Sequence, residues 1–205
     1  MEKTPIERVY YAFYTSKKQR MYFNELRETA KMSISSLQNS IRKMEKSKEI
    51  TRFKERANVF YSLKDKDKIA INFVKFDIQR LNNLNINVKL PVREFLEKAR
   101  DIAFVLLFGS ASRDEEKEGS DIDLLVVTYN FKEKLNRLYQ KEIRKEIEEI
   151  KSGASAKSLY PLSITFVDEK EFSTRKDHLL EQAKKTGFCI YNQQYYYREI
   201  LKDET

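Results

Sequence analysis

Apolar residues recur at helical spacing through the first third of the chain. This spacing predicts helices over residues 6–16, 22–32 and 34–48. Pro5 suits the start of the first helix, and Ser33 suits the N-cap of the third. The third helix carries an apolar stripe, which we expect to be buried: Ile34, Leu37, Ile41 and Met44.

The apolar pattern then changes from helical to strand-like. Two β-prone runs, over residues 49–53 and 59–63, flank the polar residues 54–58, and together they predict a hairpin. Residues 66–100 return to helical spacing and predict a connector that is broken near Pro91.

The remainder of the chain alternates between strands and helices. Apolar runs predict three strands: residues 103–108, 120–127 and 160–168. Helical spacing predicts a long charged helix over 131–153, with Gly153 as its C-cap, and a later helix over 174–187 closed by Gly187. We therefore predict an α+β fold class, in which residues 101–205 form an α/β domain with a small mixed sheet.

Composition limits the class of protein. Hydrophobic residues make up 40% of the 205 residues, which is enough for a core. No run approaches the roughly 18 apolar residues of a membrane helix, and the first residues lack the apolar core of a signal peptide. Cys189 is the only cysteine, so an intrachain disulfide is excluded and a reducing compartment is favoured. We expect a cytoplasmic protein with no membrane partner.

Charge is distributed unevenly along the chain. Residues 1–64 hold 15 Lys and Arg against 7 Asp and Glu, whereas the remaining residues hold 25 of each. The whole excess of +8 therefore lies in the first third. This asymmetry indicates an N-terminal part that binds a polyanion and a balanced remainder with a different role.

The order helix, helix, helix, hairpin resembles a winged helix-turn-helix domain, here over residues 1–65. The resemblance implies binding of double-stranded DNA, with the third helix in the major groove. Its polar face and the basic hairpin supply the candidate DNA contacts: Ser35, Ser36, Gln38, Asn39, Arg42, Lys43, Arg52, Lys54 and Arg56. A small helical domain with a solvated basic face is the alternative.

Candidate chemistry is concentrated between Phe108 and Val127. Gly109 and Ser110 follow an uncharged strand, where a sharp bend can present backbone N–H groups to phosphate oxygens. Asp121 and Asp123 alternate with apolar residues on the next strand, so both carboxylates share one face. Two hard oxygen ligands beside a phosphate cradle suit Mg²⁺.

This order of an apolar strand, Gly-Ser, a polar loop and Asp-Ile-Asp resembles the DNA polymerase β-like nucleotidyltransferases, and most closely the minimal nucleotidyltransferases. The resemblance covers about residues 101–192. It implies Asp121 and Asp123 as catalytic metal ligands for Mg²⁺ or Mn²⁺, and ATP or another NTP as substrate or ligand. It also implies nucleotide contacts by four residues: Gly109, Ser110, Arg113 and Ser120.

One position departs from the family pattern. Active members carry a third carboxylate on the next long strand, and Ser163 stands at that place. Asp168 lies five residues further along and on the opposite face. Three interpretations stay open: a working nucleotidyltransferase fused to a DNA-binding domain, a transcriptional regulator whose inactive domain senses a nucleotide, and a regulator that keeps the domain only for dimerisation.

Partners follow mainly from the resemblances. Some minimal nucleotidyltransferases modify a tyrosine of a partner toxin, so the expected acceptor is such a protein, a nucleic-acid hydroxyl or the chain's own tail. That tail carries four tyrosines: Tyr191, Tyr195, Tyr196 and Tyr197. Aromatic packing is the simpler interpretation of the tail. Analogy with winged-helix regulators predicts a homodimer.

Overall fold

The computed structural model describes residues 3–56, 58–130, 133–155 and 159–202. Two compact units divide the chain: residues 1–76 with 197–205, and residues 77–196. The division falls inside α4 (Lys66–Asn83) and inside α9 (Gln193–Lys202). Helices and two sheets make up the chain, so the α+β class is confirmed. Among the described helices, none has the length and apolar character that a membrane crossing requires.

The first unit begins with three helices and a short strand. These elements are α1 (Pro5–Ser16), β1 (Met21–Tyr22), α2 (Phe23–Ala30) and α3 (Ile34–Lys46). A capping box between Thr4 and Glu7 starts α1, and the Ser33 side chain caps α3 as predicted. Buried side chains of the three helices form the core between them, including Val9, Phe13, Leu26 and Leu37.

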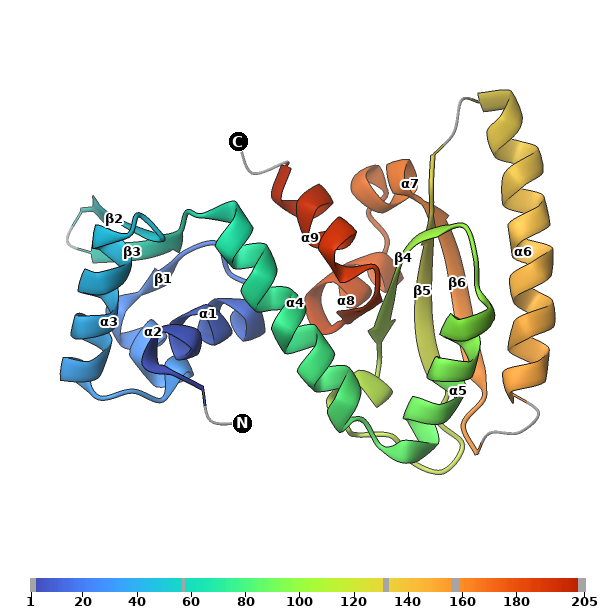
Figure 1. Cartoon of the computed structure of the whole chain (residues 1–205), viewed down its shortest axis with the longest axis horizontal. Helices are drawn as coiled ribbons and strands as arrows, with labels where there is room; N and C mark the ends of the chain where they lie inside the picture. Colours follow the sequence, from blue (N-terminus) through green and yellow to red (C-terminus); the bar gives the residue numbers. More distant parts are fainter. Residues whose placement is uncertain (1–2, 57, 131–132, 156–158, 203–205) are drawn as a thin grey trace. The chain divides into compact units, whose positions relative to one another are not determined.

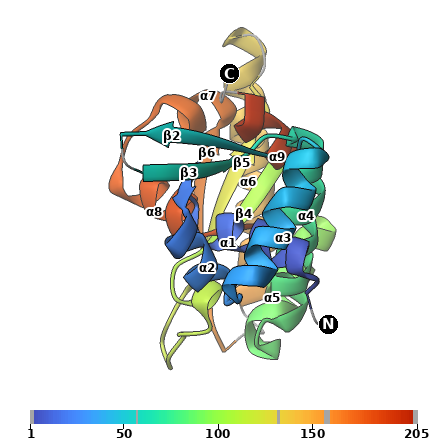
Figure 2. The same ribbon diagram turned by 90° about the vertical axis from the view of Figure 1, so that its left-hand side faces the viewer.

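A three-stranded antiparallel sheet completes this unit. β2 (Ile50–Glu55) and β3 (Asn58–Leu63) form the hairpin, and β1 pairs with the other edge of β3. Figure 2 shows β2 and β3 side by side, with α3 close to the hairpin. Both strands extend further than predicted, so Lys54 lies inside β2 and Arg56 occupies the turn with φ 56°.

Ile34 corrects the predicted stripe of α3. Its side chain is 52% exposed, whereas Leu37, Ile41 and Met44 are buried as expected. Ile34 is the first residue of the helix, so its side chain extends beyond the surface that the later turns bury. Ser40 occupies the buried side instead, with its hydroxyl donating to Ser36 O at 2.9 Å.

The second unit has a four-stranded mixed sheet in the order β6-β5-β4-β7. The strands are β4 (Ile102–Phe108), β5 (Ile122–Thr128), β6 (Leu162–Asp168) and β7 (Phe188–Tyr191). β5 and β6 are parallel, whereas β4 is antiparallel to both β5 and β7. Every residue of β4 is buried, in agreement with its uncharged sequence.

Helices cover both faces of this sheet. α5 (Ile86–Lys98) and α6 (Glu133–Ser155) pack on one face, where Leu124 and Val126 join Val92 and Ile147 in the core. α7 (Glu169–Thr174) and α8 (His178–Thr186) pack on the other; Figure 1 shows α6 and α8 on opposite sides. Asp123 alternates with Leu124 and therefore belongs to the second face.

Two helix ends test the glycine predictions. Gly187 is the C-cap of α8, and a Cβ there would overlap Ala183 O, so the close turn requires glycine. The predicted stop at Gly153 is wrong, because α6 continues to Ser155. Gly153 meets no neighbouring atom within 4 Å of a hypothetical Cβ, so nothing in its packing demands a cap there.

Candidate functional site

The bend after β4 is the centre of the candidate site. Gly109 has φ 73°, a conformation that favours glycine, and the short 3₁₀ helix η1 (Ala111–Arg113) follows it. Gly109 O accepts hydrogen bonds from Ser112 Oγ at 2.8 Å and from Arg113 Nη1 at 3.0 Å. These bonds close the bend on itself and hold the backbone at the end of the strand.

Asp123 lies directly against this bend. The β4–β5 register pairs Phe108 with Asp123, and a Cβ added to Gly109 would overlap Asp123 Oδ2 and come within 3.2 Å of its Cγ. Only glycine therefore leaves room for the carboxylate. The structure brings together the two halves of the motif that the sequence separates by a polar loop.

The electrostatics of the site come from two neighbouring acids. Asp121 is exposed and immediately precedes β5. Burial raises the pKa of Asp123 above its ordinary value, the charge of Asp121 raises it further, and a hydrogen bond with Ser163 opposes both effects. A divalent cation bound by both carboxylates would relieve their repulsion.

Ser163 lies beside Asp123 on the neighbouring strand. The parallel register pairs Asp123 with Ser163 and continues without a shift to Thr128 and Asp168. Asp168 is thus at the other end of β6, where its side chain caps α7 by accepting from Glu171 N at 2.7 Å. Asp168 cannot replace a carboxylate at Ser163.

The remaining predicted nucleotide contacts have different surroundings. Ser110 is half-buried, and its hydroxyl makes no hydrogen bond to the described residues. Arg113 pairs with Glu115, at 2.7 Å between Nε and Oε2, in addition to its bond with Gly109 O. Ser120 Oγ accepts from Lys117 N at 2.9 Å, so it shapes the loop.

Arg80 supports the bend and was missed by sequence reasoning. Its Nη2 donates to Ser112 O at 2.7 Å, and its guanidinium lies 4.0 Å from the centre of the Phe188 ring. Arg80 belongs to α4, which the sequence indicated only as a connector. No local signal links it to a loop 32 residues away.

The loop between Ser110 and Asp121 contains a second residue that the sequence did not single out. Within the described residues, Glu116 Oε2 is the buried side-chain oxygen or nitrogen atom without a hydrogen-bond partner. A buried oxygen without a partner is costly unless another group satisfies it. Glu116 is therefore a residue whose contacts should be examined in a complex of the loop with a ligand.

The donor set fits Mg²⁺ or Mn²⁺ held jointly with phosphates. In the described part of the chain, no group of three or more His, Cys, Asp or Glu residues is placed to hold a metal ion. Mg²⁺ is commonly bound by one or two carboxylates, with waters and substrate phosphates as its other ligands. Asp121 and Asp123 supply two carboxylates. They lie next to the bend at Gly109, where the absence of a side chain leaves space beside Asp123.

The predicted DNA contacts are mostly solvent-accessible in the first unit. On α3, Ser35, Gln38, Asn39, Arg42 and Lys43 are exposed and Ser36 is half-buried; in the hairpin, Arg52, Lys54 and Arg56 are exposed. The spacing of Ser35, Gln38, Asn39 and Arg42 places them on one helix face. This exposure is compatible with a nucleic-acid surface and with a solvated basic face.

The family assignment comes from a comparison of sequences. Residues 91–196, just over half of the chain, match the family model described as polymerase beta, nucleotidyltransferase. The chain belongs to the polymerase beta nucleotidyltransferase family. The match includes the bend at Gly109, both aspartates and Ser163, and it leaves residues 1–90 untested.

Other comparisons add little to the nucleotidyltransferase assignment. One matching crystal structure is of a candidate nucleotidyltransferase from Sulfolobus solfataricus. It is 22% identical, covers 58% of this chain and 83% of that chain, and gives a TM-score of 0.29. No curated protein matches the chain. The nucleotidyltransferase family implies an NTP and a divalent metal ion as ligands.

Proposed function

We propose that the second unit binds an NTP with Mg²⁺ or Mn²⁺ at Gly109–Asp123 and transfers its nucleotidyl group to a hydroxyl. The observation that carries this proposal is the Asp123 carboxylate packed against Gly109 in a nucleotidyltransferase-family chain. This contact brings the two parts of the proposed site, the phosphate-binding bend and the carboxylate pair, next to each other.

Each residue has a role in that reaction. Backbone N–H groups at Gly109 and Ser110 bind phosphate oxygens, and Asp121 and Asp123 hold the divalent ion, which neutralises phosphate charge when bound. The acceptor oxygen forms a bond to the α-phosphorus, and pyrophosphate leaves. Arg113 exchanges its ion pair with Glu115 for contacts with the phosphates and so orients them. Ser120 stabilises the loop by accepting a hydrogen bond from Lys117 N.

Ser163 limits the rate of this chemistry. A serine hydroxyl does not accept a proton from the attacking hydroxyl near pH 7, so water must take it. Loss of a positioned base costs roughly 10²- to 10⁴-fold in rate. This observation favours a second candidate function, in which the unit binds the metal-nucleotide as a sensor and hardly turns it over.

Incubation with α-labelled ATP and Mg²⁺ separates the candidates. Transfer predicts label on a protein or oligonucleotide acceptor that disappears in the Asp121→Ala/Asp123→Ala variant. Metal-dependent binding of ATP without label supports the sensor. Absence of both leaves a domain kept for dimerisation.

For the first unit, the proposal is a winged helix-turn-helix domain that binds double-stranded DNA. Support comes from the element order α1-β1-α2-α3-β2-β3, the exposed polar face of α3 and the net positive charge of residues 1–64. Fluorescence anisotropy with a labelled duplex at several salt concentrations tests it. Substituting both Arg42 and Lys43 by Ala should lower the affinity and reduce the salt slope by about one for each DNA phosphate that the variant no longer neutralises.

The acceptor is proposed to be a partner protein or nucleic acid in preference to the tail. Tyr196 and Tyr197 are buried, and the Tyr195 hydroxyl donates to Glu169. Burial raises the pKa of Tyr196, and a phenol that ionises less readily is a poorer nucleophile. Tyr191 is half-buried and is the tail residue to check by intact-mass and peptide analysis after ATP treatment.

A further inference from the structure

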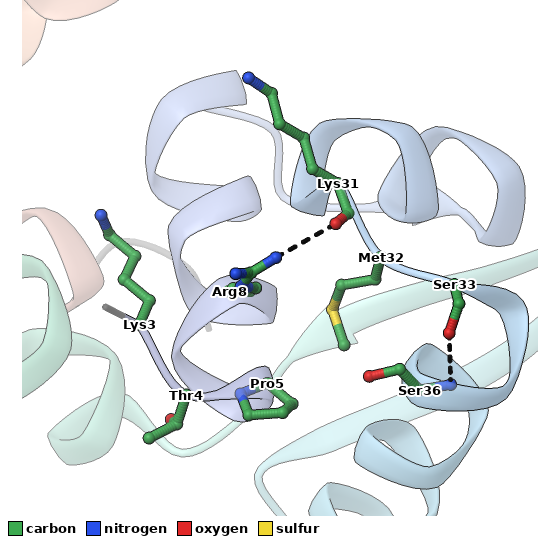
Figure 3. Close-up of a pocket in the computed structure, with 8 residues that line it drawn as sticks. All are labelled: Lys3, Thr4, Pro5, Arg8, Lys31, Met32, Ser33 and Ser36. Atoms are coloured by element: carbon green, nitrogen blue, oxygen red, sulfur yellow. Dashed lines mark hydrogen bonds between the residues drawn. The ribbon is translucent and has the colours of Figure 1, made fainter.

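A second candidate ligand site lies in the first unit. A pocket of about 470 Å³ opens between the start of α1, the α2–α3 connection and the start of α3. Figure 3 shows side chains from all three segments around it. Its volume falls within the ~300–1,000 Å³ range of small-molecule sites.

The charge of the pocket is one-sided. Lys3, Arg8 and Lys31 line it, and none of the described residues that line it is acidic. Arg8 Nη1 donates to Lys31 O at 3.2 Å, which fixes the guanidinium within the pocket (Figure 3). Lys3 Nζ lies 4.1 Å from the centre of the Tyr11 ring. Figure 3 shows the Lys31 side chain extended away from Ser33 and Ser36, so Arg8 supplies the cation that is held in place within the pocket, and guanidinium groups suit phosphate oxygens.

Hydroxyl and apolar groups complete the lining. Ser33 and Ser36 lie at the first turn of α3, and the Ser33 hydroxyl accepts from Ser36 N at 3.2 Å. The helix dipole adds positive potential at this end of α3. Pro5 and Met32 provide apolar surface in the same pocket, which a phosphate alone does not need.

We propose that this pocket binds a nucleoside phosphate, with its phosphate on Arg8 and its base or sugar against Pro5 and Met32. A nucleoside phosphate and a DNA backbone both offer a phosphate group to this pocket. The volume of the pocket and its apolar surface favour the nucleoside phosphate as the ligand. This site is separate from Gly109–Asp123 and does not depend on two aspartates or a metal.

Calorimetry tests the proposal without interference from the metal site. The full chain with Asp121→Ala/Asp123→Ala is titrated with ATP in EDTA. Binding near one equivalent is expected, and addition of Arg8→Gln should weaken it at least about tenfold, in line with the removal of a charge-assisted hydrogen bond. Arg27→Gln, which removes the same charge from α2 outside the pocket, should leave the affinity unchanged. Absence of metal-independent binding, or equal affinity in the Arg8 and Arg27 variants, would overturn the proposal.

Photolabelling locates the ligand in the unsubstituted chain, so this test does not depend on whether the Arg8→Gln variant folds. With 8-azido-ATP in EDTA, label is expected on peptides from residues 3–36. Label confined to peptides around residues 105–125 would contradict the proposal.

A duplex-binding titration distinguishes the two phosphate sources. If Arg8→Gln weakens duplex binding and not ATP binding, the pocket holds backbone phosphate and the small-ligand proposal is wrong.

Discussion

Gly109 is the residue on which the candidate nucleotide site depends most directly. Its φ of 73° disfavours any side chain, and a Cβ would overlap Asp123 Oδ2. We predict that Gly109→Ala displaces the carboxylate, lowers stability by roughly 1–3 kcal/mol and weakens Mg²⁺-ATP binding at least about tenfold. Thermal melting and calorimetry measure the two effects. Gly153→Ala, in open space within α6, is the matched control: it should leave Mg²⁺-ATP binding unchanged and raise stability by up to about 1 kcal/mol, because alanine favours a helix interior.

Ser163 offers a test by gain of function. Its register beside Asp123 means that Ser163→Asp places a third carboxylate at the candidate metal site. We predict that nucleotidyl transfer increases about tenfold or more, because a carboxylate can hold the ion and take the proton. The control is Thr165→Asp, which adds the same charge two residues along β6 and on the same face. Equal rates in the two variants and the parent would show that Ser163 is not the limiting residue.

The sequence predicted the proximity of Gly109 and Asp123, for which the signal is local, and missed the contact of Arg80 with the bend, which comes from a distant part of the chain. Gly109 and Asp123 belong to a short strand-bend-strand pattern, whose pairing follows once β4 and β5 are antiparallel neighbours. Arg80 reaches the same bend from α4, and only tertiary packing brings that helix to it. The bonds of Ser120 and Arg113 within the loop also depend on how the loop closes, which residue types alone do not fix.

At the scale of elements, a buried carboxylate joins three parts of the first unit. Glu49, between α3 and β2, accepts from Tyr10 Oη of α1 at 2.8 Å and from Lys68 Nζ of α4 at 2.6 Å. Burial acts to raise the pKa of Glu49, but hydrogen bonds from Lys68, Ser47 and Tyr10 outweigh it and lower the pKa overall.

This cluster predicts a pH dependence of stability. Because the folded-state pKa of Glu49 is lowered, its stabilisation is present above the unfolded value of about 4.3 and is lost as pH falls through the folded pKa. We predict that Glu49→Gln destabilises the chain by roughly 1–3 kcal/mol at pH 7 and that the difference shrinks near pH 3. Urea unfolding at both pH values measures it. Glu45→Gln, an exposed change of the same charge on α3, should show neither effect, and a pH-independent difference would contradict the role assigned to Glu49.

At the ends of helices, the sequence pattern predicted the environment of individual residues less well than it predicted the helices themselves. Periodicity identified α3, but it could not show that Ile34 precedes the buried part of the helix and stays exposed. Glycine at position 153 suggested a C-cap, yet a helix tolerates glycine at a modest cost, and α6 continues past it. Three of the four strands of the second unit were found because apolar runs of their length fit a sheet covered on both faces, whereas the short β7 (Phe188–Tyr191) was not predicted from the apolar pattern.

At the scale of the whole molecule, we propose that the predicted homodimer forms through α4. Ile71 is 68% exposed and Ile78 is 45% exposed, and a separation of seven residues places them two turns apart on one face. Exposed isoleucines at this spacing suit a helix that packs against a second copy of the chain.

We predict that light scattering gives twice the mass of the 24.5 kDa chain and that Ile71→Glu with Ile78→Glu reduces it to one chain. Buried charges would oppose helix pairing, whereas the same residues in a monomer face water and tolerate glutamate. Leu179→Glu, at an exposed leucine on α8, is the control and should remain dimeric. A parent mass of one chain would refute the dimer, and a dimer that survives both glutamates would place its interface away from α4. If the first unit binds DNA as proposed, a dimer brings two such units to one duplex, so the monomeric variant should also lose duplex affinity beyond the effect of its charge.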